Sequence, residues 1–135
     1  MITAVDTNVL LDVLTGDARH GRASADALRR CLAEGGLVAC APVWAELAAA
    51  YERPTSAASV LDEVGVEFDP IGRDIALAAG SAWRAYRARG GTRRRIMTDF
   101  LIGAHARERA DRLLTRDRGF YRSYFRRLEL LDPGA

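Results

Sequence analysis

Four acidic side chains stand where a folded chain can gather them into one reactive site, and they are Asp6, Glu46, Asp99 and Asp117. Two of them follow short apolar stretches that predict buried strands, residues 2–5 and 113–115. The other two lie at or near the start of segments with helical spacing. All four have apolar neighbours, among which a charge without a partner is costly. We refer to these four residues as the acidic cluster.

Strand and helix patterns alternate along the rest of the chain. Strands are predicted over residues 2–5, 37–41, 66–68, 113–115 and 128–131, the third of them at an edge of the sheet. Helices are predicted over residues 9–14, 20–34, 56–64, 73–89, 99–110 and 120–125, and one more begins at Pro42. Thr7 or Asn8 should cap the first helix, and Thr98 the helix that begins at Asp99. An equally good interpretation of Asp6 is that it only caps that first helix. This alternation predicts an α/β fold with a parallel sheet and helices on both faces, in which the carboxyl ends of the strands share one edge.

Length and composition bound the class of protein. With 135 residues, 49% of them hydrophobic, the chain should form one domain over residues 1–135 with a substantial core. The sequence contains neither an apolar run of the ~20 residues that a membrane span needs nor a basic leader before an apolar segment. We therefore expect no membrane association and a cytoplasmic location. Cys31 and Cys40 fall in helix and strand patterns and are expected to be buried free thiols.

Carboxylates that meet at one edge repel each other and raise one another's pKa, and a divalent cation cancels this repulsion. Oxygen ligands alone favour Mg²⁺ or Mn²⁺ over zinc. His105 lies about 240° around its helix from Asp99 at ~100° per residue, so it should point elsewhere. Such a site performs phosphoryl chemistry, in which one cation activates water and a second stabilises the leaving oxygen. Asp12, half a helix or more beyond Asp6, is expected to be a surface or supporting residue.

All 20 basic residues are arginines, which excludes every mechanism that needs a catalytic lysine. This absence counts against a phosphorylation-driven receiver domain, a haloacid-dehalogenase-like phosphatase and a phosphate-binding loop of the GxxxxGK type. The phosphatase also needs a second aspartate where Asn8 stands. Arginines are expected to contact a polyanion backbone near the acidic cluster, and they are Arg93, Arg94, Arg95, Arg116 and Arg118. For Arg93 to Arg95 a solvated loop is an equally good interpretation.

The chain resembles a PIN-domain ribonuclease, and within that family a VapC-type toxin of a toxin–antitoxin pair. The resemblance spans nearly the whole chain and depends on four segments in order. They are Val-Asp-Thr-Asn-Val-Leu from Val5, Pro-Val-Trp-Ala-Glu-Leu from Pro42, Asp-Phe-Leu-Ile-Gly-Ala-His-Ala from Asp99, and Leu-Leu-Thr-Arg-Asp-Arg-Gly-Phe from Leu113. No single segment is decisive, but four in this order and spacing are specific.

The resemblance implies a PIN-like three-layer fold with a central five-stranded parallel sheet, and a Mg²⁺- or Mn²⁺-dependent endoribonuclease. It implies that the acidic cluster is catalytic, that Asp6, Asp99 and Asp117 hold the metal, and that Asn8 and Thr115 support them. It also implies an RNA substrate, a homodimer and a VapB-like antitoxin whose tail covers the active site. Gly119 stands where some relatives carry a further acid, which leaves open whether one or two metal ions bind.

The main alternative is a PIN-like scaffold that binds RNA or a protein without cutting it. The intact acidic cluster argues against a scaffold, because an unused cluster of charges costs stability. No residue pattern selects tRNA, ribosomal RNA or messenger RNA as the target, and none identifies the antitoxin.

Overall fold

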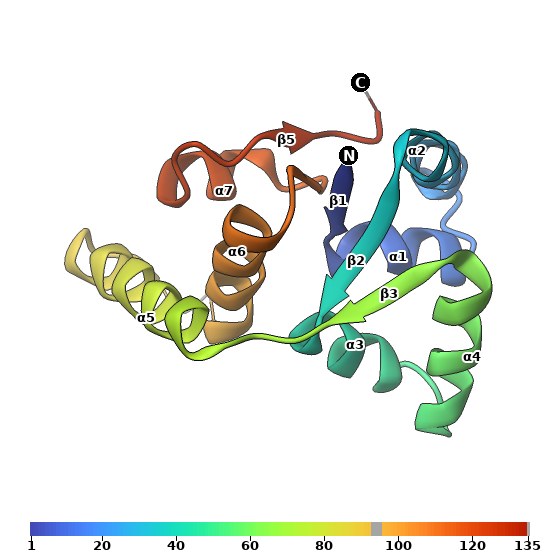
Figure 1. Cartoon of the computed structure of the whole chain (residues 1–135), viewed down its shortest axis with the longest axis horizontal. Coiled ribbons are helices and arrows are strands. Elements are labelled where there is room, and N and C mark those ends of the chain that lie inside the picture. The colour runs from blue at the N-terminus through green and yellow to red at the C-terminus, as the bar shows by residue number, and fades with distance from the viewer. Residues whose placement is uncertain (93–95, 135) are drawn as a thin grey trace.

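The computed structural model describes residues 1–92 and 96–134, which form a parallel sheet with flanking helices (Figure 1). In this part of the chain the sheet has five strands in the order β3-β2-β1-β4-β5, and each neighbouring pair is parallel. The strands are β1 (Ile2–Val5), β2 (Gly36–Cys40), β3 (Val66–Asp69), β4 (Arg112–Leu114) and β5 (Leu130–Leu131). The helices are α1 (Thr7–Leu14), α2 (Gly21–Glu34), α3 (Ala41–Ala48), α4 (Pro54–Val64), α5 (Arg73–Ala88), α6 (Met97–Arg109) and α7 (Arg118–Tyr124). The predicted fold class is confirmed.

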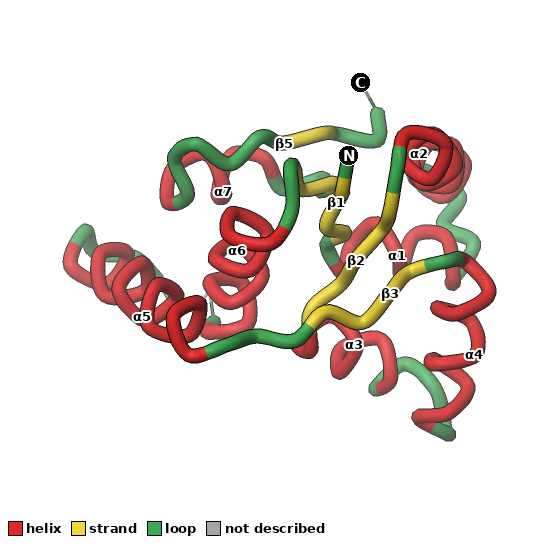
Figure 2. Tube along the Cα trace, viewed as in Figure 1, coloured by secondary structure: helices red, strands yellow, loops and turns green. Residues whose placement is uncertain are grey.

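The central strand, β1, is buried on both faces. Thr3, Ala4 and Val5 are consecutive and all buried, although neighbouring strand residues point to opposite faces. This pattern is typical of a parallel strand covered by helices on each side. The edge position predicted for residues 66–68 is also confirmed: β3 pairs only with β2 among the described strands, and its Phe68 is 54% exposed (Figure 2).

The strand order reverses between β1 and β4, and this reversal positions the acidic cluster. From β1 the chain moves outward through β2 to β3, then returns to the other side of β1 for β4 and β5. In open parallel sheets, ligands bind at the carboxyl ends of the strands on either side of such a switch point. Asp6 and Thr115 directly follow these two strands, and the Asp6 backbone N–H donates to the Leu114 carbonyl at 3.0 Å.

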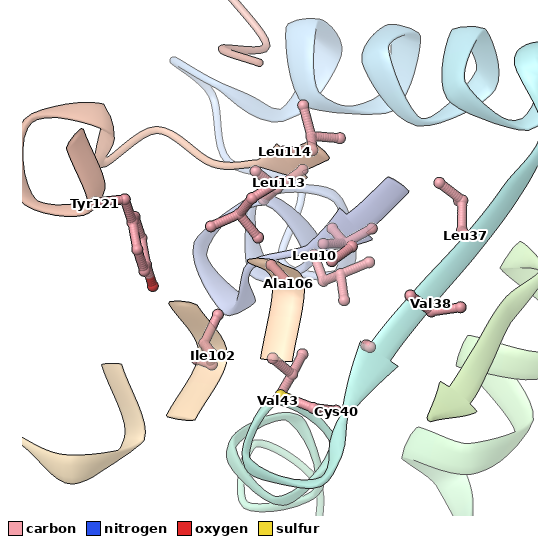
Figure 3. Close-up of a cluster of buried hydrophobic side chains, with 14 of the residues drawn as sticks. Leu10, Leu37, Val38, Cys40, Val43, Ile102, Ala106, Leu113, Leu114 and Tyr121 are labelled. Carbon is pink, nitrogen blue, oxygen red and sulfur yellow. The ribbon is translucent and has the colours of Figure 1, made fainter. Parts of the chain in front are cut away.

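Apolar side chains from the strands, α1, α3, α6 and α7 form one core (Figure 3). Gly103 of α6 lies directly against the buried ring of Phe125: a Cβ at this position would be 2.4 Å from the Phe125 Cε2 atom. Only glycine lets the helix and the ring approach this closely. On another face α6 packs along α5, the longest helix of the described chain, which lies at the left in Figure 1.

Several predicted element ends differ from the structure by one or two residues, and two predicted helix caps are wrong. Asp6 itself is the N-cap of α1, in place of Thr7 or Asn8. Thr98 does not cap α6, because the helix begins at Met97, two residues before the predicted start at Asp99, and Ile96 is its N-cap. The last strand is only Leu130–Leu131 instead of residues 128–131, although the Leu113 backbone N–H of β4 already donates to the Glu129 carbonyl at 2.9 Å. No helix of the described residues is both long enough and apolar enough to cross a lipid bilayer.

Candidate functional site at the carboxyl ends of β1 and β4

The Asp6 carboxylate accepts hydrogen bonds from three neighbouring residues. Asp6 is buried, with only 6% of its surface exposed. Oδ1 accepts the backbone N–H of Thr7 at 2.8 Å, which satisfies one free amide at the start of α1. Oδ2 accepts the Thr115 hydroxyl at 2.7 Å and the Asn8 side-chain amide at 3.4 Å. Asp6 is therefore both a helix cap and a fixed charge at the switch point of the sheet.

Burial raises the pKa of Asp6 to about 6. Hydrogen bonds from Thr115, the Thr7 backbone and Tyr121 act in the opposite direction, and the charge of Asp99 adds a further rise. The electrostatic coupling expected within the acidic cluster is thus present between Asp6 and Asp99. The charge of Asp99 raises the pKa of Asp6 less than burial does. Burial is therefore the main reason why the folded protein favours the protonated form of Asp6.

Asp99 lies in the first turn of α6, where its Oδ2 accepts the backbone N–H of Ile96 at 3.2 Å. Both Asp99 and Asp6 face the hydroxyl of Tyr121, a residue of α7 that is 1% exposed. In Figure 3 the Tyr121 oxygen points from α7 towards the part of α6 that carries Ile102. Burial raises the pKa of Tyr121 well above its usual value, and the charges of Asp6, Asp99 and Asp117 raise it further. Tyr121 therefore stays protonated, and its hydroxyl lowers the pKa of Asp6.

Glu46 joins the cluster through Thr7. The Thr7 hydroxyl donates to Glu46 Oε1 at 2.8 Å, while the Thr7 backbone N–H donates to Asp6. One threonine therefore links the carboxylate on α3 to the carboxylate after β1. Cys40, at the end of β2, lies within electrostatic range of both acids. Burial raises the Cys40 pKa to about 12, so this thiol is not a nucleophile at neutral pH.

Asp117 is connected to Asp6 through Thr115. The Asp117 backbone N–H donates to the Thr115 hydroxyl at 3.0 Å, and that hydroxyl donates to Asp6. Arg116, which lies between Thr115 and Asp117, contacts two residues of α1. Its backbone N–H donates to Asn8 Oδ1 at 3.3 Å, and its guanidinium binds both carboxylate oxygens of Asp12 at 2.7 and 2.9 Å. The loop that carries Asp117 is thus fastened to the helix that follows Asp6.

The arginines predicted to contact RNA have different surroundings. Arg93, Arg94 and Arg95 lie outside the described residues. Arg116 has its guanidinium on Asp12, which is 4% exposed and also accepts the Ser24 hydroxyl at 2.8 Å. Asp12 is accordingly a buried supporting residue and not a surface one. Arg118 pairs with Asp132 at 3.1 Å at a position where its side chain is 46% exposed.

The donor set of the cluster is composed of carboxylate, hydroxyl and amide oxygens, which suits Mg²⁺ or Mn²⁺. Across residues 1–92 and 96–134, no group of three or more histidine, cysteine or acidic side chains is arranged to hold a metal ion. Mg²⁺ commonly binds through one or two carboxylates and keeps its remaining waters. Asp6 and Asp99, whose charges interact, supply carboxylate oxygens, the donor type that this ion takes.

Two residues of the site, Tyr121 and Thr7, were not expected from the sequence, whereas the positions of His105 and the two cysteines were. Tyr121 and Thr7 were not predicted to take part; the signal for Tyr121 was its place in the short helix that begins next to Asp117. His105 was expected to point away from the cluster, and it does: its Nε2 lies 2.8 Å from Asp69 Oδ2 at the end of β3. Cys31 and Cys40 are buried free thiols as expected.

The sequence profile described as the PIN domain matches residues 3–126 of this chain. No curated protein sequence matches it. The matched range includes all four acids of the cluster and both strands that flank the switch point.

Solved structures with the same fold come from bacterial toxin–antitoxin systems. The VapBC2 structure from Rickettsia felis, bound to a promoter DNA fragment, is 21% identical with a TM-score of 0.74, over 98% of each chain. VapBC-1 from nontypeable Haemophilus influenzae is 19% identical with a TM-score of 0.75, over 100% of each chain. Mycobacterium tuberculosis VapC20, described as a sarcin-ricin loop cleaving toxin, is 16% identical with a TM-score of 0.60, over 94% of this chain and 98% of that one. At these identities the likeness establishes the fold alone.

Proposed function

This chain belongs to the PIN domain family, and from that membership and the geometry of the acidic cluster we propose that it is a metal-dependent endoribonuclease, the toxin of a toxin–antitoxin pair. The observation that carries the proposal is Asp6, a buried carboxylate with a pKa of about 6 that lies within the electrostatic range of Asp99. A charge in this setting is costly unless an opposite charge accompanies it. A divalent cation that also binds a phosphodiester would supply that opposite charge.

Some residues of the acidic cluster would bind the metal ion, and other residues keep them in position. Asp6 and Asp99, with Asp117, would hold Mg²⁺ or Mn²⁺, which when bound neutralises phosphate charge and makes water more acidic. Thr115 and Asn8 keep the Asp6 carboxylate in place through their hydrogen bonds. Glu46, held by Thr7, is the acid best placed to accept a proton from the attacking water, because it is exposed to solvent.

The partners that we propose are the ones found with structural neighbours of this chain. Those neighbours include VapBC complexes, and VapC20 is described as cutting the sarcin-ricin loop. We infer an antitoxin of the VapB type for this chain, an RNA substrate and a homodimer. A toxin that cuts cellular RNA acts in the cytoplasm, which is where we place the protein.

Incubation of the purified protein with total cellular RNA, with and without Mg²⁺, tests the proposal directly. We expect discrete cut ends that appear only with the cation and that can be mapped by sequencing. The non-cleaving scaffold is the second candidate, because the described residues hold no ready group of three metal-binding side chains. A scaffold would bind RNA in a gel-shift assay and leave it uncut, both with and without Mg²⁺. This result would favour the scaffold over the nuclease.

Mg²⁺ should also stabilise the protein, because the ion binds the folded cluster and not the unfolded chain. At an ion concentration about tenfold above its dissociation constant, the gain is roughly 1.4 kcal/mol, or about 3–5 °C in Tm. Glu46→Gln should show a smaller shift, since it removes one charge of the cluster. Differential scanning fluorimetry with and without Mg²⁺ measures both shifts.

The matched control for this prediction is Glu63→Gln, which removes the same charge from an exposed position on α4. Its Mg²⁺ shift should equal that of the wild type. Equal shifts in all three proteins would mean that the ion does not bind at the acidic cluster.

A further inference from the structure

Four arginines line two adjoining hollows where α5, α6 and the end of α7 meet. One hollow, of about 520 Å³, is bounded by Arg107, Glu108, Arg126 and Arg127. The other, of about 260 Å³, shares Arg107 and Arg126 with the first and extends to Arg89 and Tyr124. We call the combined surface of Arg89, Arg107, Arg126 and Arg127 the arginine hollow. Its positive charges come from three separate parts of the chain, so the fold and not the sequence brings them together.

The arginine hollow has very little compensating negative charge. Within the part of the chain that the structure describes, none of its four guanidiniums forms an ion pair, and Glu108 is the single acid on its walls. Other arginines are neutralised: Arg109 binds Asp69 at 3.0 Å and Arg112 binds Glu34 at 3.1 Å. Like charges gathered without counter-charges repel each other, and an anionic ligand would relieve that repulsion.

Several features hold these arginines in position. The guanidinium carbon of Arg89 lies 5.6 Å from the ring centre of Tyr124, and that of Arg107 lies 5.5 Å from the ring centre of Phe125. A guanidinium stacked on an aromatic ring keeps its N–H donors at its edge, where they can bind phosphate oxygens. Arg127 adopts a left-handed φ of 70°, a backbone conformation that is unfavourable for a residue with a side chain. Strain of this kind is typical of positions that bind ligands.

The hollow and the acidic cluster lie at opposite ends of the same two helices. Asp99 is in the first turn of α6 and Arg107 is in its last turn, a separation of about 12 Å at 1.5 Å per residue. Likewise α7 begins next to Asp117, and the chain directly after its end carries Arg126 and Arg127. An RNA strand whose reacting bond lies at the acidic cluster would have to span at least this distance to reach the arginine hollow.

We propose that the arginine hollow binds the phosphate backbone of single-stranded RNA whose reacting bond lies at the acidic cluster. This inference rests on the proposed function for the identity of the polyanion. Guanidinium edges match phosphate oxygens in pairs, and a chain of regularly spaced charges can engage several arginines at once. The hollow would thus hold nucleotides at a distance from the cut and would affect affinity, not the chemical step.

The test measures binding without cleavage, using the full-length protein in EDTA and a fluorescein-labelled single-stranded RNA of 20 nucleotides. Fluorescence anisotropy is followed over a series of NaCl concentrations. In the double variant Arg107→Gln/Arg126→Gln we expect the slope of log K against log salt to become shallower by about 1.4, since each lost phosphate contact removes ~0.7. Affinity at low salt should fall by about tenfold or more.

Two further variants keep the test independent of folding and of total charge. Arg126→Gln/Arg127→Gln removes no ring contact and should give the same loss. Arg19→Gln/Arg30→Gln removes two charges from exposed positions at and before α2 and should leave the slope unchanged. Equal slopes for the hollow variants and the wild type would overturn the proposal, and so would an equal loss in the control pair. Loss of binding to a poly-glutamate peptide with unchanged RNA binding would assign the hollow to an acidic protein instead.

The result is separable from the proposed nuclease activity, because no bond is cut in EDTA. A protein that never cleaves RNA with Mg²⁺, but whose hollow variants lose salt dependence, would contradict the nuclease and support the hollow. If the wild type cleaves RNA but the hollow variants bind it like the wild type, the nuclease is supported and the role of the arginine hollow is contradicted.

Discussion

Asp99→Asn is expected to lower the rate of RNA cleavage by about a thousandfold and to abolish growth inhibition when the protein is expressed. Removal of one charged group that acts on the transition state typically costs ~10²–10³ in rate. The fold should survive, because the asparagine carbonyl oxygen can still accept the backbone N–H of Ile96 at the start of α6. Cleavage of a labelled RNA and colony counts after induction measure the two effects.

Asp62→Asn provides the control, since Asp62 is an exposed acid on α4 and its substitution changes the net charge equally. This variant should cut RNA and inhibit growth like the wild type. If Asp99→Asn were as toxic as the wild type at equal expression, the nuclease assignment would fail. An independent sign of coupling is the pKa of Asp6, which should fall in Asp99→Asn because the Asp99 charge raises it.

Asp6→Asn should make the folded protein more stable than the wild type at pH 8, by about 2 kcal/mol. The pKa of Asp6 rises from 3.8 to about 6 on folding, so holding this carboxylate ionised costs about 3 kcal/mol at 1.36 kcal/mol per unit. Asparagine avoids this cost but loses part of the hydrogen bonding to Thr7 and Thr115, which reduces the gain. The free energy of unfolding in urea at pH 4, 6 and 8 gives the comparison.

The pH dependence has a definite sign. Between pH 4 and pH 6 the folded state binds more protons at Asp6 than the unfolded state does, so this residue makes the wild type less stable as pH rises. The stability difference between Asp6→Asn and the wild type should therefore grow from pH 4 to pH 6 and level off above it. A variant that is less stable than the wild type at pH 8 would show that the hydrogen bonds of Asp6 outweigh its burial.

The parallel sheet, and the position of Asp6 beside the strand that precedes Thr115, could be predicted because both depend on local patterns and on one rule of topology. Residues 2–5 and 113–115 are short, apolar and followed by an acid, and the carboxyl ends of parallel strands share an edge. The caps predicted at Thr7 or Asn8 and at Thr98 were wrong, whereas the alternative role of Asp6 as the cap of the first helix is confirmed. In both places an acid binds a free backbone amide. Asp6 caps α1, and Asp99 reaches back to the amide before α6.

The side-chain partners could not be predicted, since they depend on contacts between distant parts of the chain. Arg116 and Asp12 are 104 positions apart, and no local pattern indicates that the guanidinium is neutralised there. Tyr121 resembled any aromatic residue of a short amphipathic helix. Its hydroxyl affects the pKa of Asp6 from α7, and near the end of that helix the Phe125 ring packs against Gly103 of α6.

The hydrogen bond between Thr115 and Asp6 joins residues 109 positions apart. A ribosome delivers Asp6 first and Thr115 many seconds later, at roughly 5–20 residues per second. During that interval β1 has no β4 beside it, and Asp6 is left open to water with its ordinary acidity. The hydrogen bonds that link Asp6 to Thr115 and Thr115 to Asp117 therefore form only after residues 115 and 117 have been added, so the acidic cluster is among the last parts of this fold to be assembled.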